Sequence, residues 1–215
     1  MHAADFLVIA LADGAGSAAR SHEGAALAVT AALGTALDAL SRHVSAESAA
    51  TEACNAAIAA LAGDTDLACT LTLAVADAQT LAVLHVGDSP AFVIFDEAAR
   101  VEHLEAPPVS EFPNETMFLT SRGALPVIRT FPLGDVAAVV VASDGLTPVA
   151  SRTVRWCDEQ GTANASYEPH LGFFAPLLAH ARAADLDLAA LLAHLVAERR
   201  VTDDVTVVVA TLGRP

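Results

Sequence analysis

"LACTLTLAVADAQTLAVLHVGDSPAFVIFD", residues 67–96, decides the fold class, because it holds three apolar runs separated by two short polar turns. The turns fall at Asp77-Ala78-Gln79 and at Gly87-Asp88-Ser89-Pro90, and both have the composition of tight reversals. Short apolar runs bounded by such turns are typical of strands. We therefore predict three successive antiparallel strands that form a meander.

The sequence on either side adds helices and further strands to this meander. Residues 6–12 predict a buried strand, because an apolar run ends there in a Gly-rich turn. A helix is predicted over 21–42, with Ser21 as its N-cap and leucines recurring along it. The remaining predicted elements are a second helix at 46–61, a surface loop at 102–115, strands near 116–120, 126–131, 136–142 and 204–212, and a helix from a cap at Asp185 to about Arg200. Periodicity alone thus predicts a mixed α and β fold.

Composition restricts the class of partner. The 215-residue chain suits one domain over residues 1–215, or at most two small ones. Its net charge of −15 disfavours nucleic acid and favours cations. No stretch reaches the roughly 18 uninterrupted apolar residues of a membrane span, so no membrane partner is expected. Three cysteines without metal-type spacing favour a reducing compartment, and we expect a cytoplasmic protein; the oligomeric state stays open.

Acidic residues stand at the ends of three apolar runs. Asp13 follows the apolar run of "VIALADG", and Asp144 follows that of "VAAVVVASDG". The pair Asp203-Asp204 precedes the apolar run of "TDDVTVVVA". Asp-Gly is common turn chemistry, which explains any single one of these sites. Three of them beside strands predicted to be central favour a divalent cation, because carboxylates gathered at one sheet edge repel one another. Oxygen ligands alone suit Mg²⁺ or Mn²⁺, and the carbonyl of Gly14 adds a further candidate ligand.

Five segments, in this order and spacing, resemble the metal-dependent protein serine/threonine phosphatases of the PP2C type, in their bacterial branch. The resemblance covers residues 7–211 and implies two packed antiparallel sheets flanked by helices, an α+β sandwich. It also implies hydrolysis of phosphoserine or phosphothreonine in a protein by a metal-activated water. The segments are "ADGAGSAARSHEGAALAV", "CTLTLAV", "LHVGDSPAFVI", "VVVASDGL" and "TDDVTVVV".

The resemblance also implies roles for individual residues. Asp13 matches the ligand that bridges two Mg²⁺ or Mn²⁺ ions, and Gly14 the residue that offers a backbone carbonyl to one of them. Asp144 and Asp203 match ligands of the second ion, so that Asp13, Asp144 and Asp203 carry the catalysis. Asp88 matches an acid of a third, weaker metal site, and Asp204 is expected to be a neighbour rather than a ligand.

The chain departs from the family pattern at its beginning. Family members usually have a strand before the first Asp-Gly motif, with an acid that supports the metal site and often a basic residue that binds the phosphate. Neither has a counterpart in "MHAADFLVIAL". Arg20 and Arg122 are candidates to replace the basic residue, although surface arginines are common. Two functions therefore stay open: a working phosphatase, or a catalytically weak or inactive PP2C-like module that binds a phosphoprotein or another partner.

Overall fold

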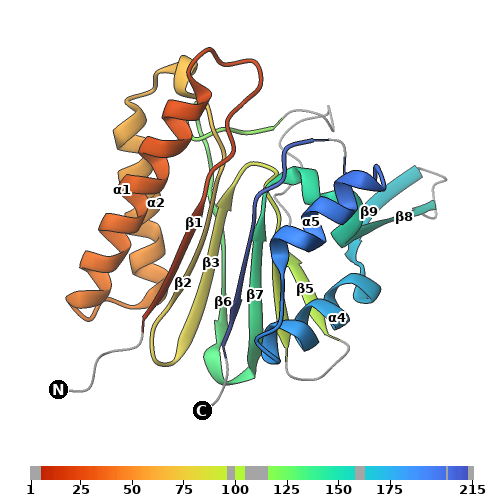
Figure 1. Ribbon diagram of the computed structural model, residues 1–215. Coiled ribbons are helices and arrows are strands. Elements are labelled where there is room, and N and C mark those ends of the chain that lie inside the picture. The colour runs from red at the N-terminus through yellow and green to blue at the C-terminus, as the bar shows by residue number, and fades with distance from the viewer. Residues whose placement is uncertain (1–5, 96–99, 105–115, 158–162, 202, 213–215) are drawn as a thin grey trace.

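The computed structural model describes residues 6–95, 100–104, 116–157, 163–201 and 203–212. Two antiparallel sheets pack face to face, with helices on the outer side of each (Figure 1). The first sheet has the strand order β1-β2-β3-β6, and the second has the order β10-β7-β4-β5. The α+β sandwich expected from the resemblance is confirmed.

The bounds of the elements agree with most of the predicted ones. The first sheet contains Leu7–Leu11 (β1), Leu71–Ala76 (β2), Thr80–Val86 (β3) and Val127–Pro132 (β6). The second contains Val207–Thr211 (β10), Val136–Ala142 (β7), Ala91–Phe95 (β4) and Val101–Leu104 (β5). Ser151–Cys157 (β8) and Ala163–Pro169 (β9) form a separate hairpin. The helices are Ser21–Ser41 (α1), Ala46–Leu61 (α2), Thr147–Ala150 (α3), Leu171–Arg182 (α4) and Leu188–Ala197 (α5).

Alternation along the central strands places side chains in three apolar layers. In β2, Leu73 and Val75 pack against α1 and α2, whereas Ala74 faces the second sheet. In β7, Val140 faces α4 and the residues next to it face the first sheet. Because both faces of these strands are covered, their sequences are apolar throughout, unlike strands with one face in water.

The two helices on the first sheet are held together by alanines. The buried face of α1 contains Ala28, Ala32 and Ala36, and α2 presents a similar alanine face. Leu27 and Leu37, two of the leucines that recur along the predicted helix, are instead exposed. The length and mean hydropathy of α1 would also allow a membrane span, as is true of many core helices of soluble proteins.

Several predicted details were wrong. The three strands of residues 71–95 do not form one meander, because β4 leaves β3 and pairs with β5 and β7 in the other sheet. Ser21 is the first helical residue and not the cap; it packs against Gly14. The proposed strand near 116–120 is a turn, in which the Phe118 N–H donates to the Ser121 hydroxyl.

Two further boundaries also moved. The predicted loop at 102–115 begins with β5, and its residues 105–115 lie outside the described ones. The last helix is capped by Asp187, whose carboxylate accepts from the Ala190 N–H, while Asp185 pairs with His180. The β8–β9 hairpin was not among the predicted elements.

The sheet register brings the acidic turns to one end of the sandwich. Leu11 at the end of β1 pairs with Thr72, and Val86 at the end of β3 pairs with Leu71. In the second sheet, Ala142 at the end of β7 pairs with Val207 at the start of β10. The four chain segments that follow or precede these ends therefore meet at the upper end of the sandwich in Figure 1.

Candidate metal centre

Asp13 is held by a two-way contact with Thr70. The Asp13 N–H donates to the Thr70 hydroxyl at 3.0 Å, and the Thr70 N–H donates to the Asp13 carbonyl at 2.8 Å. The Thr70 hydroxyl also contacts the Ser89 hydroxyl at 2.8 Å, and both side chains are buried. The backbone of Asp13 is therefore tied to the turn that carries Asp88.

Asp88 lies in a turn that requires the glycine before it. Gly87 has φ +110°, and a Cβ there would lie 2.5 Å from Cγ2 of Thr70. Either feature disfavours any other residue, so Gly87 lets the turn approach the Asp13 segment closely. The Asp88 carboxylate itself is exposed and accepts from the Thr116 hydroxyl at 2.5 Å.

Asp144 and Asp203 come from two segments that are fastened together. Asp144 starts a short 3-10 turn directly after β7, and Asp203 lies in the loop before β10. Ser143, just before Asp144, bonds to the backbone of Asp204 and Thr206. The Asp203 carboxylate accepts from the N–H of Asp204 at 2.8 Å, which fixes its position relative to the loop.

The electrostatics show that these four carboxylates are neighbours. Burial is the largest cause of a raised pKa at Asp13, which reaches about 6; the charges of Asp144, Asp88 and Asp203 raise it further. Burial also raises the pKa of Asp144, and Asp88 and Asp203 add to that rise. Within the part of the chain that the structure describes, no basic side chain contributes to either shift. This is an uncompensated cluster of negative charge.

The donor set fits a hard divalent cation by its chemistry. Four carboxylates that repel one another gain most from a small, doubly charged ion with oxygen ligands. Among the described residues, no three Asp, Glu, His or Cys side chains converge closely enough to form a ready coordination group. The acids therefore share one electrostatic environment without an assembled coordination shell, and their roles as ligands stay a prediction.

Arg20, one of the two arginines considered for phosphate binding, is already paired. Its guanidinium donates to Asp64 at 2.5 Å and lies 3.6 Å from Glu23. Arg122 is exposed, in a turn that packs beside the site: the Leu119 N–H donates to the Cys69 carbonyl at 2.9 Å. Of the two, Arg122 is the better placed to meet a ligand.

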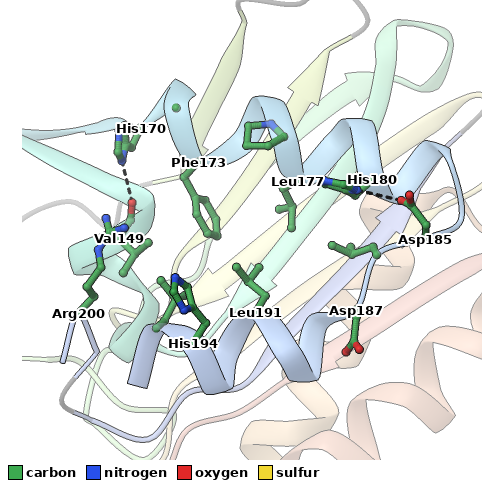
Figure 2. A pocket seen from close by; sticks show the side chains of 14 residues that line it. Val149, His170, Phe173, Leu177, His180, Asp185, Asp187, Leu191, His194 and Arg200 are labelled. Atoms are coloured by element: carbon green, nitrogen blue, oxygen red, sulfur yellow. Dashed lines mark hydrogen bonds and ion pairs between the residues drawn. The ribbon is translucent and has the colours of Figure 1, made fainter. Parts of the chain in front are cut away.

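A pocket of the described surface lies away from these acids. A cavity of ≈ 430 Å³ between α4 and α5 has an apolar floor that includes Phe173, Leu177 and Leu191, with His170, His194 and Arg200 around it (Figure 2). None of the four acids lines it. The pocket is therefore distinct from the acidic cluster. The acidic cluster is identified by its concentration of negative charge and not by a cavity.

Sequence reasoning missed the hydroxyls that support the acids. Thr70, Ser89 and Ser143 are all buried. Thr70 bonds to the backbone of Asp13, Ser89 lies beside Asp88 and contacts Thr70, and Ser143 bonds to the loop that carries Asp203. Their signal in the sequence is a small polar residue at an otherwise apolar strand end, directly beside or near an acid. That pattern is also typical of ordinary turns, so it is not specific on its own.

The pKa of Asp13 predicts how pH acts on the metal-free protein. The folded pKa of about 6 exceeds the ordinary 3.8, so this group stabilises the fold fully below 3.8 and loses that contribution as pH rises through 6. In EDTA, the wild type should be less stable at pH 8 than at pH 5 by roughly 1 kcal/mol, allowing for solvent screening. Urea unfolding at the two pH values measures this, and Asp13→Asn should reduce the difference; an equal difference in both proteins would refute it.

Comparisons with known proteins give a matching family for this chain and similar solved structures. The family described as protein phosphatase 2C matches residues 2–196. The fold is similar to the serine-threonine phosphatase 2C of Toxoplasma gondii (14% identity, TM-score 0.62, 96% of this chain and 85% of that one). It is also similar to the serine/threonine phosphatase Stp1 of Staphylococcus aureus (14%, 0.53, 95% and 83%). The catalytic domain of the phosphatase PstP, in complex with two manganese ions, is similar too (20%, 0.53, 97% and 91%). No curated protein sequence matches.

Proposed function

Because the chain belongs to the protein phosphatase 2C family, we propose that it is a metal-dependent protein phosphatase that hydrolyses phosphoserine or phosphothreonine. One observation carries this proposal: four carboxylates from separate strand ends lie close enough for their charges to act on one another, with no compensating basic side chain among the described residues. Such a cluster is costly to fold, and the binding of divalent cations would offset that cost.

In this proposal, Asp13, Gly14, Asp144 and Asp203 hold two Mg²⁺ or Mn²⁺ ions, and Asp88 belongs to a third, weaker site. Bound divalent ions would supply a water of lowered pKa and positive charge to stabilise the phosphoryl transition state. The protein's own part is to hold the carboxylates in place. Thr70 bonds to both the N–H and the carbonyl of Asp13. Such bonds hold a metal ligand in a fixed position, as a metal site requires.

The substrate would be recognised on the side of the site where Arg122 lies. The turn of residues 118–124 packs against Cys69, next to the Thr70 that holds Asp13. A guanidinium there can bind a phosphate oxygen before the reaction, which affects binding more than the chemical step.

Arg122→Gln should therefore raise KM for a phosphothreonine peptide by roughly tenfold and leave kcat within about a factor of two. Steady-state phosphate release at saturating Mn²⁺ measures both constants. Arg42→Gln is the matched control, because Arg42 lies beyond the end of α1 and pairs with Asp38 and Glu52 there. An unchanged KM in Arg122→Gln would remove Arg122 from the substrate site.

A reducing, cytoplasmic location is part of the same proposal. Cys54 and Cys69 are buried as free thiols, and burial raises the pKa of each to about 11. Thiols with such a pKa stay protonated and react little at neutral pH. Their role is packing, which fits a compartment where disulfides are rare.

The proposed function is tested by hydrolysis of p-nitrophenyl phosphate and of a phosphothreonine peptide, each with Mn²⁺, with Mg²⁺ and with EDTA. The proposal expects phosphate release with either metal and none with EDTA. Release that is equal in EDTA would overturn the metal mechanism. Mn²⁺ binding without release would instead favour the alternative function, a module that binds a phosphoprotein or another partner with little or no turnover.

A further inference from the structure

The hydroxyl and the backbone N–H of Ser143, the serine before Asp144, both bond to one neighbouring segment. The Ser143 hydroxyl donates to the Asp204 carbonyl at 3.2 Å and accepts from the Thr206 N–H at 3.0 Å. The Ser143 N–H donates to the Thr206 carbonyl at 3.0 Å. With 4% of its surface exposed, Ser143 is a buried link between the end of β7 and the loop that carries Asp203.

Gly145, on the other side of Asp144, meets the same loop. A Cβ at Gly145 would lie 2.5 Å from the Asp204 carbonyl oxygen and 3.0 Å from Cγ2 of Val205. Both residues that flank Asp144 are therefore in close contact with the backbone that directly follows Asp203. The relative position of the two acids depends on this contact.

The loop has no regular strand pairing to hold it there. The ladder between β10 and β7 begins with Val207 opposite Ala142, so Asp203 and Asp204 lie beyond its end. Like charges at Asp144 and Asp203 act to separate the two segments. Side-chain hydrogen bonds from Ser143 to the backbone oppose that separation, because they bridge the gap beyond the ladder.

We propose that Ser143 is a positioning residue, whose hydroxyl holds the loop of residues 203–206 against β7 and so sets the spacing of Asp144 and Asp203 for metal binding. The inference rests on the proposed function, because it concerns the same site. It extends that function, because the affinity of the site for metal would depend on a residue that itself binds neither metal nor substrate.

The test compares Ser143→Ala, which removes both hydroxyl bonds, with Ser143→Thr, which keeps a hydroxyl. The backbone at Ser143 (φ −73°, ψ 163°) is extended, a conformation that threonine adopts readily. Calorimetric titration with Mn²⁺ measures affinity directly, and phosphate release against Mn²⁺ concentration separates the activation constant from kcat. Ser143→Ala should weaken Mn²⁺ binding by about tenfold or more, with a smaller change in kcat at saturating Mn²⁺.

Two control variants separate positioning from general destabilisation. Ser151→Ala removes another buried serine hydroxyl, one without a hydrogen-bond partner in the described part of the chain, and should leave Mn²⁺ affinity unchanged. Val139→Ala makes a cavity in the core of β7 and should lower thermal stability without changing Mn²⁺ affinity.

The outcomes distinguish this inference from the proposed function. Wild-type affinity in Ser143→Thr with weakened binding in Ser143→Ala supports the positioning role. Equal affinity in Ser143→Ala and wild type overturns it, and so does an equal loss in both Ser143 variants, which would indicate packing instead. A wild type that binds Mn²⁺ but releases no phosphate defeats the phosphatase proposal while the calorimetry still decides the role of Ser143. A wild type that binds no Mn²⁺ overturns both.

Discussion

Asp144→Asn is expected to lower Mn²⁺-dependent phosphatase activity by roughly a thousandfold or more, because it replaces a charged ligand of the proposed metal centre with a neutral one. The side chain keeps its size, so the fold should survive. Burial and the charges of Asp88 and Asp203 raise the pKa of Asp144, so its ionised form is unfavourable in the metal-free protein. The variant should therefore be as stable as the wild type in EDTA, or more stable.

Phosphate release at saturating Mn²⁺ and thermal unfolding at pH 8 in EDTA measure the two halves of this expectation. Asp38→Asn is the matched control, because it makes the same change at an exposed residue of α1 that pairs with Arg42. The control should keep wild-type activity. An Asp144→Asn protein with substantial Mn²⁺-dependent activity would remove Asp144 from the metal centre.

The second large effect is expected at Gly24, in the first turn of α1. A Cβ there would lie 2.0 Å from the Leu67 carbonyl oxygen and 2.9 Å from the Leu67 Cα, both backbone atoms that cannot rotate away. Gly24→Ala must therefore shift either the helix or the segment that leads to Thr70. We expect a loss of about 3 kcal/mol in the free energy of unfolding.

Gly34→Ala provides the matched comparison on the same helix. A Cβ at Gly34 meets no atom within 4 Å, so alanine adds helix propensity without a clash. This variant should gain about 0.5–1 kcal/mol. Urea unfolding measures both free energies. Two variants that change stability in the same direction would show that the close approach of α1 to Leu67 is not as described.

The class of fold could be predicted from the sequence because the central strands are covered on both faces. Such strands are apolar throughout, and their turns at Asp77 and Gly87 are marked by residues that favour reversals. The strands that pair with β4 could not be predicted, because the sequence of an apolar run does not indicate which sheet it joins. Hydrogen bonding to β7, whose paired residues lie 41 (Phe95 and Val136) to 50 (Ala91 and Val141) positions further along the chain, decides that pairing.

The helix faces were harder still, because alanine outnumbers leucine on α1. Periodicity drew attention to Leu27 and Leu37, whereas the close contact between α1 and α2 is made by small residues such as Ala32. Large side chains at this contact would hold the two helices apart. Leu27 and Leu37 lie away from the contact and are exposed. Hydrophobicity alone does not separate these two kinds of apolar position.

The acids of the candidate site could be predicted from the sequence, but the hydroxyl side chains that hold them in place could not. Asp13, Asp144 and Asp203 stand out because each interrupts or borders an apolar run. Whether they meet depends on sheet register, which the sequence does not state. Thr70 and Ser143 look like ordinary turn residues until their hydrogen bonds to the acidic segments are known.

The most direct test of the account is a calorimetric Mn²⁺ titration, paired with phosphate release from a phosphothreonine peptide, on the same preparations of wild type and Asp13→Ala. The wild type should bind two Mn²⁺ ions and release phosphate only when they are bound, and Asp13→Ala should lose most of both. Phosphate release by Asp13→Ala at the wild-type rate, or full Mn²⁺ binding by the wild type with no release, would contradict it.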